Sequence, residues 1–275
     1  MRIALLLEYL GKDFSGSQAQ KDLRTVQSVL EHALPTVLRI KKTKKPLRVI
    51  LSGRTDAGVH ATGQVAHFDI PDQIIDRNVF DAQVLAWGLN GILSADISVR
   101  KVAVVPDDFH ARYSAIQRQY IYRILNSEQR SPLFQNTHYF LRTPMDVKAM
   151  QEATICLPGR HDFSAFKSTN SDKVSPICDV DYAKLLNLGE GELEFSIAAN
   201  HFVYNMIRII VGTLVEIGLK KRNPKSLKTT LMSGERKLAG PTAPASGLCL
   251  VSVKYPPPYA NIFAQKAKQG KGDIK

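Results

Sequence analysis

A single carboxylate, Asp56, stands in a short loop that is crowded with polar and charged residues. The loop, residues 52–60, reads Ser-Gly-Arg-Thr-Asp-Ala-Gly-Val-His. An apolar run, 47–51, precedes it, and residues 64–70 alternate polar and apolar types as in a half-buried strand. This pattern is typical of a reactive carboxylate on a glycine-flanked turn at the rim of a sheet, with the guanidinium of Arg54 close by.

The same residue types also make ordinary turns, and an Asx-turn accounts for most aspartates in such loops. Here Arg54, Thr55 and His60 concentrate polar groups around Asp56, as binding and catalytic loops do. Asp56 is therefore the candidate catalytic residue, and Arg54 and His60 are candidates for binding substrate. His60 and His67 match no standard zinc spacing with Asp56, so no metal is expected, and His67 is expected to partner a carboxylate.

Arg208 interrupts an apolar segment that has helical periodicity. Apolar residues recur from 203 to 215 at helical spacing, and Tyr204 and Arg208 lie one turn apart beside that stripe. The arginine either extends its guanidinium to solvent or pairs with a carboxylate in a cleft, since an unpaired buried charge is costly. The residues alone leave both interpretations open.

Tyr120 lies in an alternating segment, Arg118-Gln119-Tyr120-Ile121-Tyr122-Arg123, that predicts a strand. A tyrosine in such a strand most often belongs to the core. Arginines beside two tyrosines also suit a site where a base stacks on an aromatic ring. We interpret Tyr122 as structural and keep both interpretations for Tyr120.

The chain carries a strong excess of positive charge, with a formal net charge of +12 and a sequence pI near 9.6. Such an excess predicts an acidic partner, and nucleic acid is the leading candidate, although a basic protein without that role has the same charge. The charges cluster in two blocks, which we interpret as surfaces that attract phosphates and do not read bases. The blocks are Arg39, Lys41, Lys42, Lys44, Lys45 and Lys220, Lys221, Arg222, Lys225, Lys228.

A length of 275 residues predicts two domains of ordinary size. We place them at 1–107, which carries the Asp56 loop, and 108–258, with 259–275 as a disordered basic tail. No apolar run is long enough for a membrane span, and the N-terminus lacks a signal-peptide pattern, so a cytoplasmic location is expected. The three cysteines are widely spaced and form no zinc or disulfide pattern.

Hydrophobic periodicity predicts an α+β fold with helix-backed, mostly antiparallel sheets. Asp146 is the expected N-cap of one helix, and Asn200 that of the long helix carrying Arg208. Asn223-Pro224 is expected to start a further short helix. The predicted strands are 3–9, 47–51, 64–70, 97–105, 119–125, 177–186, 192–199 and 248–255, and the other predicted helices cover 26–37 and 81–93.

The string at 52–60 is long and specific, and it resembles the signature of the TruA family of tRNA pseudouridine synthases. The resemblance covers nearly the whole chain. Further matching segments are Tyr9-Leu10-Gly11, Thr25-Val26-Gln27, Phe109-His110-Ala111-Arg112-Tyr113, Gly159-Arg160-His161-Asp162-Phe163, Phe202 to Gly212 around Arg208, and Ala243 to Leu248.

The resemblance implies a tRNA pseudouridine synthase that acts on uridines 38, 39 and 40 of the anticodon stem-loop without a cofactor, a nucleotide or a metal. It implies that Asp56 is catalytic and that Arg208 orients it and lowers its pKa. Tyr120 would cover the flipped base. It also implies a homodimer, each tRNA bridging both subunits, and two lobes whose sheets join into one central sheet with the catalytic cleft between them.

One departure from the family pattern concerns the opening segment. The family usually has Trp where this chain has Ser17, which puts the range of RNA substrates in question. We expect this loop to touch RNA, and the departure leaves the motif of Asp56 unchanged.

Two other functions compete with this interpretation. A non-catalytic RNA-binding protein or RNA chaperone on the same scaffold would keep the basic surface but lose Asp56, Arg208 or Tyr120, and this chain has all three. A metal-dependent nuclease would need a cluster of carboxylates, whereas the loop supplies one.

Overall fold

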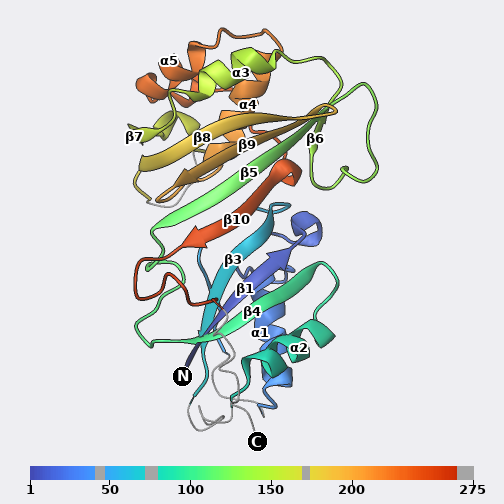
Figure 1. Cartoon of the computed structure of the whole chain (residues 1–275), viewed down its shortest axis with the longest axis vertical. Coiled ribbons are helices and arrows are strands. Elements are labelled where there is room, and N and C mark those ends of the chain that lie inside the picture. Colours follow the sequence, from blue (N-terminus) through green and yellow to red (C-terminus); the bar gives the residue numbers. More distant parts are fainter. Residues whose placement is uncertain (41–46, 72–79, 169–173, 265–275) are drawn as a thin grey trace, which may run out of the picture.

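The computed structural model describes residues 1–40, 47–71, 80–168 and 174–264. Within them, ten strands form a single sheet that runs the length of the molecule (Figure 1). The strands are β1 (Arg2–Tyr9), β2 (Ile50–Leu51), β3 (His60–Asp69), β4 (Ile97–Val105), β5 (Gln117–Asn126), β6 (Tyr139–Leu141), β7 (Gly159–Asp162), β8 (Ile177–Gly189), β9 (Glu192–Ala199) and β10 (Leu248–Lys254). This confirms the expected α+β class with a mostly antiparallel sheet.

The order of strands brings the two halves of the sequence together through β10. The main path is β4-β1-β3-β10-β5-β9-β8-β7, with β2 paired to β3 and β6 to β5. β10 is parallel to β3, where Cys249 faces His60, and antiparallel to β5, where Leu250 faces Tyr120. Gly63 on β3 is required here, because a Cβ would overlap the Val251 carbonyl of β10.

Five α-helices among the described residues lie in two groups near the two ends of the sheet (Figure 1). α2 packs on β4 and contacts α1, while α3 packs on β8 and contacts α4 and α5. None of these helices is both long and apolar enough to cross a membrane. They are α1 (Val26–Val37), α2 (Ala82–Ile92), α3 (Val147–Thr154), α4 (Met206–Gly218) and α5 (Ser226–Ser233).

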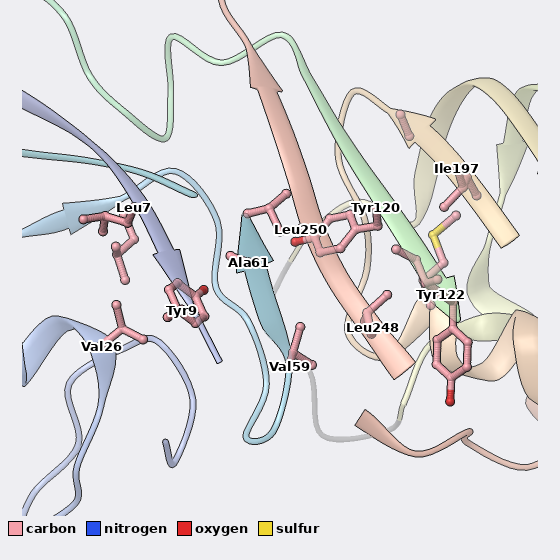
Figure 2. Packing of buried hydrophobic residues seen from close by; sticks show 14 of the residues in the cluster. Leu7, Tyr9, Val26, Val59, Ala61, Tyr120, Tyr122, Ile197, Leu248 and Leu250 are labelled. Atoms are coloured by element: carbon pink, nitrogen blue, oxygen red, sulfur yellow. The ribbon is translucent and has the colours of Figure 1, made fainter. Parts of the chain in front are cut away.

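The alternation of β1 explains why the sheet is covered on both faces. Ile3, Leu5 and Leu7 point into the large core beneath the helices, while Ala4 and Leu6 join a smaller cluster on the opposite face. The large core continues across β10 to β5, and Figure 2 shows its labelled side chains following the sheet from β1 toward β9. The site is therefore mounted on a continuously packed sheet.

The smaller cluster is closed by segments that connect or follow the strands. Phe109 and Ala111, between β4 and β5, are fully buried in it, and Tyr255 follows directly after β10. Tyr259 packs against the same cluster, so the segment 259–264 belongs to the fold and its assignment to a disordered tail is wrong. Residues 265–275 lie outside the described part of the chain, as do the lysines of the first basic block.

Several predicted elements have different boundaries in the structure. The predicted strand 47–51 contracts to β2, because the chain pairs with β3 only at its end. The long helix begins at Met206, not after Asn200, whose side-chain oxygen instead accepts hydrogen bonds from the Asp179 and His201 amides. Asp146 caps α3 as expected by accepting from the Ala149 amide.

Candidate active site

A pocket of about 760 Å³ lies where the loop of Asp56 meets the loop that leads into α4. Both sequence halves contribute to it, so residues far apart in the chain share one cavity. Its charged, aromatic and hydroxyl lining includes Ser17, Ser52, Arg54, Thr55, Asp56, Arg112, Tyr113, Arg118, Tyr120, Lys167, Phe202, Tyr204 and Arg208.

The loop of Asp56 is held by hydrogen bonds to the segment before α1. The amide of Thr55 donates to the Ser17 hydroxyl at 2.8 Å, and the Ser17 amide donates back to the Thr55 carbonyl at 3.0 Å. The Tyr9 and Thr55 hydroxyls share a further hydrogen bond of 2.8 Å. Ser17 is fully buried, so its side chain supports the segment that carries Asp56 from within the fold.

Gly58 completes the turn that presents Asp56. Its φ of +82° lies in the left-handed region that favours glycine, and the Val59 amide donates to the Asp56 carbonyl at 3.1 Å. On the other side, Gln64 on β3 donates to the Gly53 carbonyl and accepts from Ser52. The carboxylate therefore stands on a turn fixed at both ends, as the glycine pattern predicted.

Arg208 reaches Asp56 from the first turn of α4. Its Nη1 lies 3.1 Å from Asp56 Oδ2 and also donates to Asn205 Oδ1 at 2.9 Å. Its Nε donates to the Ala243 carbonyl at 2.8 Å, which fixes the plane of the guanidinium. Of the two interpretations that the residues left open, the structure supports pairing with a carboxylate, because the Arg208 side chain is only 18% exposed.

Two opposing effects set the pKa of Asp56. Burial raises the pKa of Asp56 above its ordinary value, while the charge of Arg208 and its hydrogen bond act in the opposite direction. Burial is the larger effect, because one partner does not replace the water that the carboxylate loses. Arg208 thus lowers the pKa of Asp56 as expected, but burial outweighs it, and the resulting carboxylate is more basic than one in water.

Tyr120 faces the pocket from β5 and is almost completely buried. Its ring packs edge-on against Phe202, with ring centroids 5.2 Å apart. Burial raises the pKa of Tyr120, so its phenol stays protonated. Tyr122, two residues along the same strand, is fully buried and donates to the Pro244 carbonyl at 2.7 Å. Of the two tyrosines, only Tyr120 lines the pocket.

Arg118 is a pocket residue whose role was not recognised from the sequence. Its two terminal nitrogens donate to four backbone carbonyls, those of Ser52, Arg112, Ala115 and Asn200. Burial lowers the pKa of Arg118. The carbonyls belong to the Asp56 loop, to the segment before β5 and to the end of β9. Arg118 therefore ties three walls of the pocket together, a role that depends wholly on tertiary contacts.

The structure separates the two predicted substrate-binding residues. Arg54 is exposed and lines the pocket. His60 is buried outside it, where Nδ1 accepts from the Gly11 amide and Nε2 faces the Ser246 carbonyl at 3.0 Å. Because both ring nitrogens of His60 are engaged by backbone, its predicted contact with substrate is not supported. His67 likewise has a backbone partner, the Ala111 amide, and not a carboxylate.

The pocket is strongly cationic. Asp56 is the sole acid among the described residues that line it, against five arginines and lysines. Within the described ranges, no group of three or more His, Cys, Asp or Glu side chains is arranged to hold a metal ion. The second basic block is not part of this lining, and Arg222 within it pairs with Glu216. The arrangement suits an anionic ligand bound around one partly shielded carboxylate.

Comparison with known proteins gives a consistent result. A family model described as tRNA pseudouridine synthase matches residues 6–114 and 153–256. The chain is 46% identical to tRNA pseudouridine synthase A of Halalkalibacterium halodurans over 253 residues, covering 90% of each chain. It is 40% identical to the protein of that name from Syntrophotalea carbinolica, covering 93% of this chain and 96% of the relative. The corresponding protein of Dechloromonas aromatica is 41% identical, with 94% of each covered.

Proposed function

The chain belongs to the tRNA pseudouridine synthase family, as a TruA-type isomerase, and we propose that it modifies uridines of the anticodon stem-loop with Asp56 as its catalytic residue. One observation carries the assignment of Asp56. It is the sole acid in the described lining of a cationic pocket, and the guanidinium of Arg208 holds it at 3.1 Å. The proposed target uridines are 38, 39 and 40, and the proposed location is the cytoplasm.

The reaction is an isomerisation with no net change in atoms or electrons. The bond from uracil N1 to ribose C1′ breaks, the uracil turns within the site, and a bond from C5 to the same C1′ forms. C5 then gives up its proton, and N1 gains one. The loss of the C5 proton needs a base and the protonation of N1 needs an acid. No oxidation or reduction takes place. The target base must first leave its stack, because the sugar is otherwise out of reach of a buried carboxylate.

Asp56 serves this reaction by one of two routes. It attacks C1′ as a nucleophile and is released when C5 takes its place, or it removes a proton from the sugar and returns it after the base has turned. Both routes require the ionised carboxylate. The Arg208 cation favours that ionised form, and burial, which raises the pKa of Asp56, makes the ionised oxygen more basic.

The surrounding residues take separate roles in this proposal. Arg208, which is held by the Ala243 carbonyl through Nε, orients the carboxylate through Nη1. Tyr120 covers the flipped uracil with its ring, and Arg54 at the exposed rim meets the phosphate of the flipped nucleotide. Each role follows from position: Tyr120 is buried beside Asp56, whereas Arg54 is exposed.

We also propose that the enzyme works as a homodimer in which each tRNA contacts both subunits. Light scattering on the purified protein, alone and with tRNA, tests this. A mass of one chain with full activity would exclude the dimer as a functional requirement. The proposed lobes remain 1–107 and 108–258, with β10 crossing between their strands.

The assignment is tested with an unmodified tRNA transcript, with and without EDTA, using wild type, Asp56→Asn and Asp56→Glu. Pseudouridine is mapped by carbodiimide labelling and primer extension. We expect product from the wild type at uridines 38–40, and a fall in kcat of about a thousandfold or more for Asp56→Asn at equal RNA binding. Transcripts with cytidine at each target position identify which uridines are used.

The non-catalytic alternative makes a different prediction in the same experiment. If the chain were an RNA chaperone, the wild type and Asp56→Asn would bind RNA equally, and neither would give pseudouridine. It would instead accelerate annealing of complementary RNA strands, and the Asp56→Asn variant would do so as well as the wild type. The cationic pocket fits both functions, but the fixed Arg208–Asp56 contact favours catalysis.

A further inference from the structure

Three aromatic rings in contact lead from the core to the pocket, and the outer two of them are stacked. His67 on β3 is buried, and its ring meets that of His110 at a centroid distance of 4.8 Å and an angle of 64°. His110 then stacks on Tyr113, with centroids 4.4 Å apart and an interplanar angle of 28°. The innermost ring is part of the core, and the outermost lines the same pocket as Asp56.

Backbone hydrogen bonds fix the orientation of this stack. Nδ1 of His110 accepts from the amides of Arg112 and Tyr113 at 3.2 and 3.1 Å. The His110 amide donates to the Ser114 hydroxyl, and the Ser114 amide donates to the His110 carbonyl. Arg118 holds the carbonyl of Arg112 at 2.6 Å. The Tyr113 ring is therefore positioned by the fold before any ligand arrives.

The tyrosine at the end of the stack is unusually exposed. Tyr113 is 79% exposed, whereas Tyr120 deeper in the same pocket is 8% exposed. The guanidinium carbon of Arg112 lies 5.9 Å from the centre of the Tyr113 ring. The pocket mouth thus presents a preoriented aromatic ring beside a cation, the combination on which unpaired bases stack while their phosphates meet arginine.

We propose that Tyr113 is a second base-binding platform, on which a nucleobase next to the flipped uridine stacks. This rests on the proposed function, since it assumes that a uridine enters the pocket beside Asp56. Flipping one nucleotide exposes the faces of its neighbours, which lose stacking energy. Tyr113 replaces that lost contact, and Arg112 meets the adjacent phosphate.

Loss of the Tyr113 platform should affect KM and kcat differently from loss of a residue that acts on the reacting uracil. The stacked neighbour does not change during the reaction, so Tyr113 binds the ground state and the transition state equally. Loss of binding energy that is equal in the ground state and the transition state raises KM and leaves kcat nearly unchanged. Tyr120, which covers the reacting base itself, is expected to affect kcat as well.

The test uses Tyr113→Phe, Tyr113→Leu and Tyr113→Ala in steady-state assays on unmodified tRNA. Phe keeps the ring, Leu keeps apolar surface without a ring, and Trp87→Ala on α2 controls for loss of a 66% exposed ring outside the pocket. We expect KM within about twofold of wild type for Phe, and about tenfold higher for Ala and Leu, with kcat within about threefold.

A second measurement reports the stacking directly. 2-Aminopurine replaces each nucleotide beside the target uridine in turn, and its fluorescence is followed on binding. The platform is supported if fluorescence at one position is quenched by the wild type and by Tyr113→Phe but not by Tyr113→Ala. Equal quenching with all three proteins, or a KM for Tyr113→Ala no higher than for Trp87→Ala, overturns it. Absence of any product from the wild type would instead overturn the proposed function.

Discussion

Asp56 and Arg208 are separated by 152 residues of sequence and joined by a contact of 3.1 Å between Oδ2 and Nη1. The aspartate stands on the loop before β3, and the arginine on the first turn of α4. β3 lies on one side of β10 in the strand order, whereas α4 contacts α3, which packs on β8 on the other side. The pair therefore depends on the assembled sheet, and its chemistry is sensitive to every contact that sets this distance.

Replacement of Arg208 should change the pH dependence of the reaction. The Arg208 cation opposes the effect of burial on the pKa of Asp56, so Arg208→Met should raise that pKa further. Since Asp56 works ionised, the acid limb of kcat/KM should move to higher pH. At neutral pH we expect kcat to fall by about 100-fold or more, because the carboxylate also loses its orientation.

Arg208→Lys is the matched control for charge. It keeps a cation but cannot contact Asp56, Asn205 and the Ala243 carbonyl together. We expect a smaller displacement of the acid limb than for Arg208→Met, with a similar loss of kcat. Identical acid limbs for wild type and Arg208→Met would contradict the electrostatic role.

Removal of the Ser17 hydroxyl should weaken the loop that carries Asp56. In Ser17→Ala the buried Thr55 amide loses its acceptor, which costs roughly 1–3 kcal/mol of unfolding free energy. We expect a lower kcat with little change in KM, since the catalytic loop loosens while the cationic lining stays. Urea unfolding and steady-state kinetics measure the two effects.

Ser233→Ala provides the comparison for Ser17→Ala. Ser233 is exposed at the end of α5, where its hydroxyl donates to the Thr230 carbonyl. Its loss should change stability by less than about 0.5 kcal/mol and leave kcat unchanged. Equal effects of the two substitutions would mean that Ser17 does not position Asp56.

Protonation of His67 should destabilise the fold in acid. Burial lowers the pKa of His67 to about 4, below its ordinary value of 6.5. As the pH falls below 6.5, His67 therefore binds a proton in the unfolded chain but stays neutral in the folded chain. Stability is lost between pH 6.5 and 4, by roughly 3 kcal/mol from this residue. Thermal unfolding across this range measures it.

His67→Asn isolates this contribution, because the Asn carbonyl can take over as acceptor for the Ala111 amide without titrating. The variant should be less stable than wild type at pH 7, where it lacks the packed ring. Its stability should also fall less steeply toward pH 4. Parallel curves for the two proteins would assign the acid sensitivity to other groups.

The ring and the hydroxyl of Tyr120 should have separable effects. Burial raises the pKa of Tyr120, so its phenol stays neutral up to at least its ordinary value and contributes no basic limb below it. Tyr120→Phe should therefore leave the basic side of the kcat/KM profile unchanged. Tyr120→Leu removes the ring packed on Phe202 and should lower kcat/KM by about tenfold or more. A basic limb that disappears in Tyr120→Phe would show that the phenol titrates during turnover.

The residues that the sequence identified share local signals. Asp56 sits between glycines in a polar loop, and Arg208 is a charge within an apolar run. Both are visible without knowledge of the fold, and alternation gave most strands for the same reason. The start of α4 was misplaced because Asn200 has the residue type of an N-cap, and only tertiary structure shows that it binds the amides of Asp179 and His201.

The residues that the sequence missed act through distant partners. Nothing in the sequence distinguishes Arg118 from the other arginines, because its four carbonyl acceptors are brought to it only by the fold. Ser17 was assigned to the RNA-facing loop, because its hydrogen bond to Thr55 spans 38 residues. The sequence predicted the lowering effect of Arg208 on the Asp56 pKa but not the larger effect of burial, for a related reason. Burial is a property of the assembled pocket, whereas the sequence shows only the charges that will enter it.

The central position of β10 also sets the order of events during synthesis. The strands that flank it, β3 and β5, emerge from the ribosome long before residues 248–254 do. Until then their facing edges are unpaired and open to association with other chains. No strand yet connects the loop of Asp56 to the helix of Arg208. A nascent chain that stops before β10 thus holds almost every residue of the pocket but lacks the strand that joins its two halves.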